Sequence, residues 1–191
     1  FHDNEDGFLG GAYGTLTFEY SEFANNGFGD FGHNHNVYVD EGERLIFRHN
    51  YSHHAQVGHT LKTRARENYI LYNRIMDETT GNSSYTVDVP NGGLTFVIGN
   101  LLQQGPSTEN SALMNYGTEG LASGATHQLY LVNNSFVNDR GSGSFLQYQS
   151  GTALVRTINN LFLGGGTVPS GGVVQATTNL TTNAPGFVNE G

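Results

Sequence analysis

Basic and imidazole side chains are concentrated in one stretch of this 191-residue chain, whose formal net charge is −9. Residues 33–74 hold six of the eight basic residues and six of the eight histidines: Arg44, Arg48, Lys62, Arg64, Arg66 and Arg74, with His33, His35, His49, His53, His54 and His59. Such a cluster can supply a general base together with cations that neutralise a carboxylate. We therefore expect this stretch to carry the chemistry of the protein.

One chemistry that fits these residue types is proton abstraction next to a carboxylate. A base would remove the proton α to a uronate carboxyl group, and an arginine would neutralise that carboxylate and make the carbon acid stronger. The candidate catalytic residues are Lys62, Tyr38, Arg64, Arg66, Asp88 and His59, and the candidate substrate-binding residues are Asn36, Thr60, Asn115, Arg44 and Arg48. The alternative is a salt bridge between Lys62 and Asp88, which would contribute about 0–1 kcal/mol at an exposed site.

Two further groups of side chains could bind ligands. His33 and His35 form a His-x-His pattern, which on a strand places both rings on one face, and His59 would complete a three-histidine metal site. The alternative is that these histidines form hydrogen bonds within turns. Exposed tyrosines can stack on sugar rings, and Tyr38, Tyr51 and Tyr72 are the candidates.

The composition limits the fold that positions these residues. Only 13% of the residues are charged, and the chain has 27 Gly, 4 Pro and no Cys. These values exclude a helical bundle with charged outer faces, a disulfide scaffold and a thiolate site. No apolar run approaches the roughly 20 residues of a membrane span, and the acidic balance argues against wholesale nucleic-acid binding. An all-β protein is the fold class that remains.

A short element recurs along the chain, with a strand-like run before it and another after it. Each copy opens with Ser or Asn, and the copies begin at Ser21, Asn50, Asn73, Asn100, Asn134 and Asn160. Short strands that cannot bury a face alone, repeated with variable loops, are typical of a β-solenoid. The Asn residues suit a ladder of stacked side-chain amides at a corner of the coils.

The period-2 pattern of the runs that follow these elements predicts which side chains share a column. Tyr38, Lys62, Asp88 and Asn115 would form an outward column, and Asn36, Thr60 and Thr86 an adjacent outward column. The last such run, 173–176, would continue the same sheet. Lys62 would then lie between a phenol and a carboxylate, the setting that the proposed chemistry needs.

The segments 58–75, 97–102 and 132–138 resemble coils of the right-handed parallel β-helix proteins, the pectate-lyase-like superfamily. The likeness covers residues 1 to 177 and implies an all-β, right-handed parallel β-helix of six to seven coils. Residues 178–191 are similar to the tail that leaves the last coil in such proteins. We expect one β-helix domain over 1–191, cut or processed from a longer chain, in a secreted, extracellular or periplasmic protein.

The run 61–68 also resembles the lysine-containing coil of alginate lyases and chondroitinase B-like lyases. The resemblance implies that Lys62 is the base and that the polymer is an acidic polysaccharide cleaved by β-elimination. It does not settle which of the four nearby arginines assists. It fixes no cofactor and leaves open Ca²⁺ or another divalent metal.

Two other functions remain open at this point. A non-catalytic extracellular β-helix, such as an adhesin or a subunit of a surface structure or filament, could associate end to end through its exposed coil ends. A glycoside hydrolase could be built on the same scaffold. The clustered Lys, Arg and His side chains favour the lyase.

Overall fold

The computed structural model describes residues 1–28 and 34–184, which form eighteen β-strands and no helix. The strands are β1 (Phe8–Glu19), β2 (Glu22–Ala24), β3 (Val37–Arg48), β4 (Tyr51–His53), β5 (Leu61–Thr63), β6 (Glu67–Leu71), β7 (Arg74–Met76), β8 (Val87–Val89), β9 (Leu94–Ile98), β10 (Leu101–Gln104), β11 (Ala112–Tyr116), β12 (Gln128–Val132), β13 (Ser135–Asn138), β14 (Ser144–Tyr148), β15 (Leu154–Ile158), β16 (Leu161–Gly164), β17 (Val174–Thr177) and β18 (Leu180–Thr182). None of the described segments is a helix that could cross a membrane.

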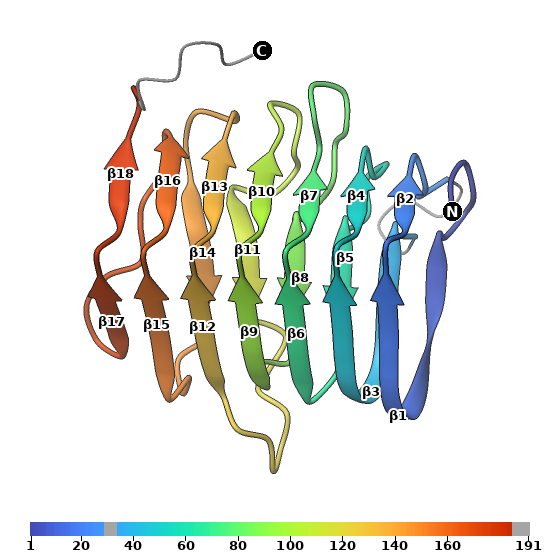
Figure 1. Cartoon of the computed structure of the whole chain (residues 1–191), viewed down its shortest axis with the longest axis horizontal. Coiled ribbons are helices and arrows are strands. Elements are labelled where there is room, and N and C mark those ends of the chain that lie inside the picture. Colours follow the sequence, from blue (N-terminus) through green and yellow to red (C-terminus); the bar gives the residue numbers. More distant parts are fainter. Residues whose placement is uncertain (29–33, 185–191) are drawn as a thin grey trace.

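These strands wind into a right-handed parallel β-helix, as predicted (Figure 1). Each full coil contributes three strands to three parallel sheets, as β8, β9 and β10 do. The rear sheet runs β5-β8-β11-β14, the front sheet β6-β9-β12-β15-β17, and the top sheet β2-β4-β7-β10-β13-β16-β18. The long strands β1 and β3 belong to both the rear and the front sheet, because β3 pairs with β5 through its first residues and with β6 through its last. Seven coils result, within the predicted number.

The predicted outward column of the rear sheet is confirmed. Tyr38 pairs with Lys62, Lys62 with Asp88, and Asp88 with Asn115. Their neighbours in the same strands, such as Leu61 and Val87, point inward and are fully buried in the core. One run was assigned to the wrong sheet: β17 pairs with β15, so residues 174–177 belong to the front sheet.

The predicted amide ladder is also confirmed, at the corner between the front and top sheets. Each Asn before the last donates from its backbone N–H and its Nδ2 to the Oδ1 of the equivalent Asn in the next coil, and its Nδ2 also donates to a strand carbonyl oxygen. The ladder runs through Asn50, Asn73, Asn100, Asn134, Asn160 and Asn179.

The end of this ladder corrects the predicted boundary of the tail. Asn179 accepts hydrogen bonds from Asn160, and β18 pairs with β16, so residues 178–182 are part of the seventh coil. The remaining residues of the predicted tail, from 185 onward, lie outside the described part of the chain.

Candidate functional site

The outward side of the rear sheet brings together most of the side chains predicted to be catalytic. Lys62 and Asp88 lie side by side, with Nζ 3.4 Å from Oδ2, and the Tyr38 ring lies 5.3 Å from the same Nζ. Outward positions of a solenoid normally face solvent, but Lys62 is only 8% exposed and Asp88 only 1%. These side chains therefore form a covered cluster.

Asp88 is the centre of that cluster. The Asn115 amide donates to its Oδ1 at 2.6 Å, and His59 Nε2 lies 3.1 Å from its Oδ2. Burial by itself would raise the pKa of Asp88, but the His59 imidazole and the Lys62 ammonium outweigh burial and hold the pKa below its ordinary value. Asp88 is thus held as a carboxylate by its neighbours.

Glu119, in the turn that follows β11, covers the cluster from outside. Its Oε1 lies 3.2 Å from Lys62 Nζ and its Oε2 2.5 Å from Arg64 Nη2. Burial would raise the pKa of Glu119, but its contacts with Arg64 and Lys62 lower it below the ordinary value. Arg64 also donates from Nε to the Tyr38 hydroxyl at 2.7 Å. The two cations expected to face a polymer are therefore occupied by carboxylates of the chain itself.

The other predicted arginines lie away from Lys62, and each has its own carboxylate. Arg66 Nε lies 3.9 Å from Glu43 Oε2, and Arg66 Nη2 donates to the carbonyl oxygen of Gly124. Arg44 pairs with Glu67 at 2.7 Å, and Arg48 pairs with Glu19, both on the outer side of the front sheet. The structure does not combine these arginines with Lys62 into one cationic surface.

Asn36 and Thr60 are corrected from an outward to an inward position. Both are fully buried, and the Asn36 Nδ2 donates to the carbonyl oxygen of His53 across the interior of the coil. The residue before each short strand has crossed the sheet plane, so the strict alternation used for the prediction does not extend to it. Side chains enclosed in this way are not placed to bind a substrate.

Two of the three histidines predicted as metal ligands do come together. The His35 and His59 rings stack with centroids 4.8 Å apart, and the His59 backbone N–H donates to His35 Nδ1 at 2.9 Å. His33 lies outside the described residues, and residues 1–28 and 34–184 contain no group of three or more side chains suited to a metal.

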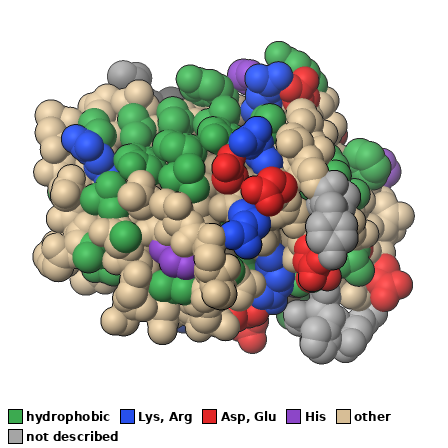
Figure 2. All heavy atoms as spheres, turned by 90° about the horizontal axis from the view of Figure 1, so that it is seen from below, with side chains coloured by type: hydrophobic (Ala, Val, Ile, Leu, Met, Phe, Trp, Pro, Cys, Tyr) green, Lys and Arg blue, Asp and Glu red, His purple; other side chains and the backbone are tan. Residues whose placement is uncertain are grey.

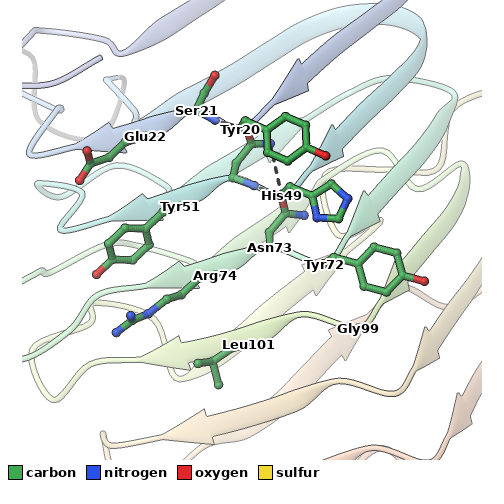
Figure 3. A pocket seen from close by; sticks show the side chains of 11 residues that line it. Tyr20, Ser21, Glu22, His49, Tyr51, Tyr72, Asn73, Arg74, Gly99 and Leu101 are labelled. Carbon is green, nitrogen blue, oxygen red and sulfur yellow. Dashed lines mark hydrogen bonds between the residues drawn. The ribbon is translucent and has the colours of Figure 1, made fainter.

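An open groove that the sequence does not predict lies along the corner between the front and top sheets. It has a volume of about 680 Å³ and crosses the first coils along the axis of the β-helix (Figure 3). One wall is a stack of Tyr20, His49 and Tyr72, whose ring centroids are 5.1 and 5.5 Å apart. Asn50 and Asn73 of the amide ladder line the groove between its walls.

The aromatic wall of the groove is made of residues in an unusual backbone conformation. Tyr20, His49 and Tyr72 have φ values of 50°, 56° and 56°, in the left-handed region that suits Gly and Asn. They gain little burial in return, because Tyr20 is 79% exposed and Tyr72 57%. In the next coils the corresponding positions are Gly99, Asn133, Asn159 and Thr178, which are also left-handed but carry no aromatic ring.

The opposite wall of the groove comes from the first residues of the top-sheet strands, Glu22, Tyr51, Arg74 and Leu101. The Arg74 guanidinium lies 4.8 Å from the centre of the Tyr51 ring and also pairs with Glu78. Burial and a hydrogen bond to Glu78 raise the pKa of Tyr51 to about 12. His53 Nε2 lies 3.0 Å from Glu22 Oε1, and this contact lowers the pKa of the Glu22 carboxyl group. The Arg74 cation of this wall is therefore already paired with a carboxylate.

Two features of the sequence mark residues of this groove, although they do not predict the groove itself. Tyr51 and Tyr72 are two of the three tyrosines nominated to stack on sugars, and Tyr20, His49 and Tyr72 each directly precede the Ser or Asn that opens a repeat element. The third nominated tyrosine, Tyr38, lies against Lys62 and Arg64 in the covered cluster.

Comparisons with protein-family models, curated proteins and solved structures found no match to this chain.

Proposed function

We propose that this protein is a non-catalytic, polysaccharide-binding β-helix of the pectate-lyase-like kind, secreted to the cell exterior or the periplasm, and that a glycan chain lies lengthwise in the corner groove. The observation that carries the proposal is the exposed wall of Tyr20, His49 and Tyr72, held in left-handed backbone conformation.

The free-energy cost of the left-handed backbone in this wall is the reason to assign the wall a function. A non-glycine residue in the left-handed region costs of order 1 kcal/mol or more, and such residues cluster at binding sites. Gly or Asn would serve the corner at lower cost, and the chain uses them at Gly99 and Asn133. Packing in the core does not compensate, since Tyr20 and Tyr72 face solvent. Ligand binding is the benefit that fits exposed aromatic rings.

The shape and charge of the groove favour a neutral glycan over an acidic one. It is open and elongated, and its lining offers phenol hydroxyls and one imidazole as hydrogen-bond partners. Its cation Arg74 is already paired with Glu78, and Glu22 adds an exposed carboxylate beside His53. A uronate polymer would need unpaired cations, which this lining does not offer.

The covered cluster around Asp88 supports a binding function without catalysis. A base in β-elimination must reach the carbon acid of the substrate, and Lys62 Nζ faces Asp88 and Glu119 instead. Eliminative cleavage at Lys62 would require the Glu119 turn to leave and the Lys62–Asp88 pair to open. A covered ion-pair cluster that joins successive coils to a loop accounts for these contacts without chemistry.

Binding to a panel of soluble polysaccharides by affinity electrophoresis and calorimetry tests the proposal. The panel includes neutral xylan, mannan and β-glucan and acidic alginate, pectate and hyaluronan. We expect at least one neutral polymer to bind, and Tyr72→Ala to weaken that binding at least tenfold. Phe28→Ala is the matched control, because Phe28 is a similarly exposed aromatic side chain outside the groove lining. Binding that survives Tyr72→Ala, or no binding to any polymer, would contradict the proposal.

A further inference from the structure

The lining of the corner groove repeats once in every coil (Figure 3). The rings of Tyr20, His49 and Tyr72 come from successive coils, with centroids 5.1 and 5.5 Å apart and planes only 8° and 11° from parallel. The opposite wall also takes one residue from each coil, because the strands β2, β4 and β7 pair in register from their first residues. A ligand that repeats at the coil spacing would therefore meet one ring in each coil.

The groove is straight, and its aromatic wall ends at Tyr72. It crosses parallel strands that stack directly on one another, so it runs along the axis of the β-helix. The corner position of the next coil is Gly99, where a Cβ atom would lie 2.5 Å from Cδ1 of Tyr72. The Tyr72 ring thus lies against this glycine, and the following corner positions, Asn133 and Asn159, carry no ring. The wall is therefore as long as three repeats of a ligand.

The rings of this wall offer the groove their edges more than their faces. His49 is covered on both faces by the two tyrosines, and each tyrosine has one face covered by His49. A single sugar beside one ring edge gains little contact, so contact area accumulates only along the axis of the molecule. Such a wall favours a segment of a linear polymer over a free monosaccharide.

The groove differs from the broad apolar surface shown in Figure 2. There, hydrophobic side chains gather in one area, and most of the basic and acidic side chains in that view lie to one side of it. A broad apolar area marks an interaction site in soluble proteins but does not confine a ligand to one line. The groove does confine it, because it has a wall on each side of the corner (Figure 3).

Glycans of the mannan and cellulose type have the straight, ribbon-like backbone that such a groove needs. Each sugar advances the chain by nearly the distance that one coil advances the solenoid, about 4.8 Å. Successive sugars face opposite ways, so the same groups recur at every second sugar, as a phenol recurs here at every second coil with the His49 imidazole between. Glycans of the laminarin and amylose type coil into helices and would leave a straight groove after a sugar or two.

Building on the proposed glycan-binding function, we propose that the ligand is a neutral glycan of the straight, equatorially linked type, bound with one sugar per coil along the aromatic wall. Tyr20, His49 and Tyr72 then each contact a different sugar. Affinity should rise with each sugar up to the third and level off beyond it, because the next coils offer no further ring.

Calorimetry of the whole 191-residue chain with defined oligosaccharides tests the linkage and the length of the site. Manno- and cello-oligosaccharides of two to six sugars are compared with laminari- and malto-oligosaccharides of the same lengths. We expect at least one of the straight series to bind, with an affinity that rises at least fivefold from two to three sugars and less than threefold from four to six. The coiled series should bind at least tenfold more weakly.

Tyr20→Ala tests the register of one sugar per coil. Removing the ring at the end of the wall should abolish the gain in affinity from the second to the third sugar, while the affinity for the disaccharide changes less than threefold. Phe28→Ala, outside the groove lining, is the matched control and should leave the dependence on length unchanged. Circular dichroism monitors the fold of both variants.

The outcomes separate the straight-chain ligand from glycan binding itself. No binding to any polysaccharide, or binding that Tyr72→Ala leaves intact, contradicts both. Where a polysaccharide binds and Tyr72→Ala weakens it, four results overturn the straight-chain ligand alone. These are straight oligosaccharides that all fail to bind, coiled ones that bind as tightly, an affinity that still rises steeply beyond four sugars, and a Tyr20→Ala variant that weakens di- and trisaccharide binding by the same factor.

Discussion

At the scale of single residues, Tyr20, His49 and Tyr72 adopt a strained left-handed backbone and still leave their rings exposed to solvent. Tyr20 ends its stack and is more exposed than Tyr72, at the other end. Asn adopts the left-handed conformation more readily than Tyr, so Tyr20→Asn should relieve strain and lose only a solvent-exposed stacking contact. We expect the free energy of unfolding to stay equal or rise by up to about 1 kcal/mol, while glycan affinity falls. Urea denaturation alongside affinity electrophoresis measures both, and a loss above about 1 kcal/mol would show that the wall is structural.

Asp88 makes the stability of the fold depend on pH. Its pKa lies below the ordinary value of 3.8, so its ion contacts stabilise the fold above that pH, and this contribution is lost as the pH falls through the lower folded value. Asp88→Asn should therefore destabilise the protein near neutral pH, and the deficit relative to the native chain should shrink below about pH 4. Urea titrations between pH 7 and pH 3 measure it, with Asp3→Asn as an exposed control. A deficit that does not change with pH would argue against an ionised Asp88.

At the scale of elements, the amide ladder ties every coil to the next. Asn100→Ala removes the acceptor for the Asn73 N–H and Nδ2 and the donor for the carbonyl oxygen of Ile70, all of them buried. Unsatisfied buried groups of this kind cost about 1–3 kcal/mol each, so a total loss of about 2–4 kcal/mol is expected. Asn179→Ala, at the less buried end of the ladder, should cost less. Equal losses at the two positions, by thermal or urea unfolding, would mean that the ladder does not act as a continuous element.

The sequence predicts the elements better than it predicts their surroundings. Period-2 alternation and the repeated Asn fix the parallel register, so that Lys62 is correctly placed between Tyr38 and Asp88. That pattern holds only within a strand, which is why Asn36 and Thr60 were misplaced. It also contains no information about loops, so the Glu119 turn that covers the cluster was not predicted. The groove was missed because it depends on residues between strands.

At the scale of the whole molecule, the cationic character suggested by the sequence is cancelled by pairing. In the described residues, Lys62 and five arginines all contact carboxylates, namely Arg44, Arg48, Arg64, Arg66 and Arg74. With a net charge of −9, the protein should repel uronate polymers. We expect an ultraviolet assay for unsaturated uronides to stay silent with alginate, pectate, hyaluronan, chondroitin and ulvan, with and without Ca²⁺. Activity that Lys62→Ala abolishes would contradict this and restore the lyase.

The amide ladder also gives the molecule a direction. Every hydrogen bond along it runs the same way, from a donor in one coil to the Oδ1 of the next coil toward the C-terminal end. Its amide dipoles therefore align, as peptide dipoles do in an α-helix, with the positive end toward the last coil. Any extra coil, whether from the same chain or another, can extend the ladder only head to tail. An inverted coil would bring donor to donor at one end or acceptor to acceptor at the other.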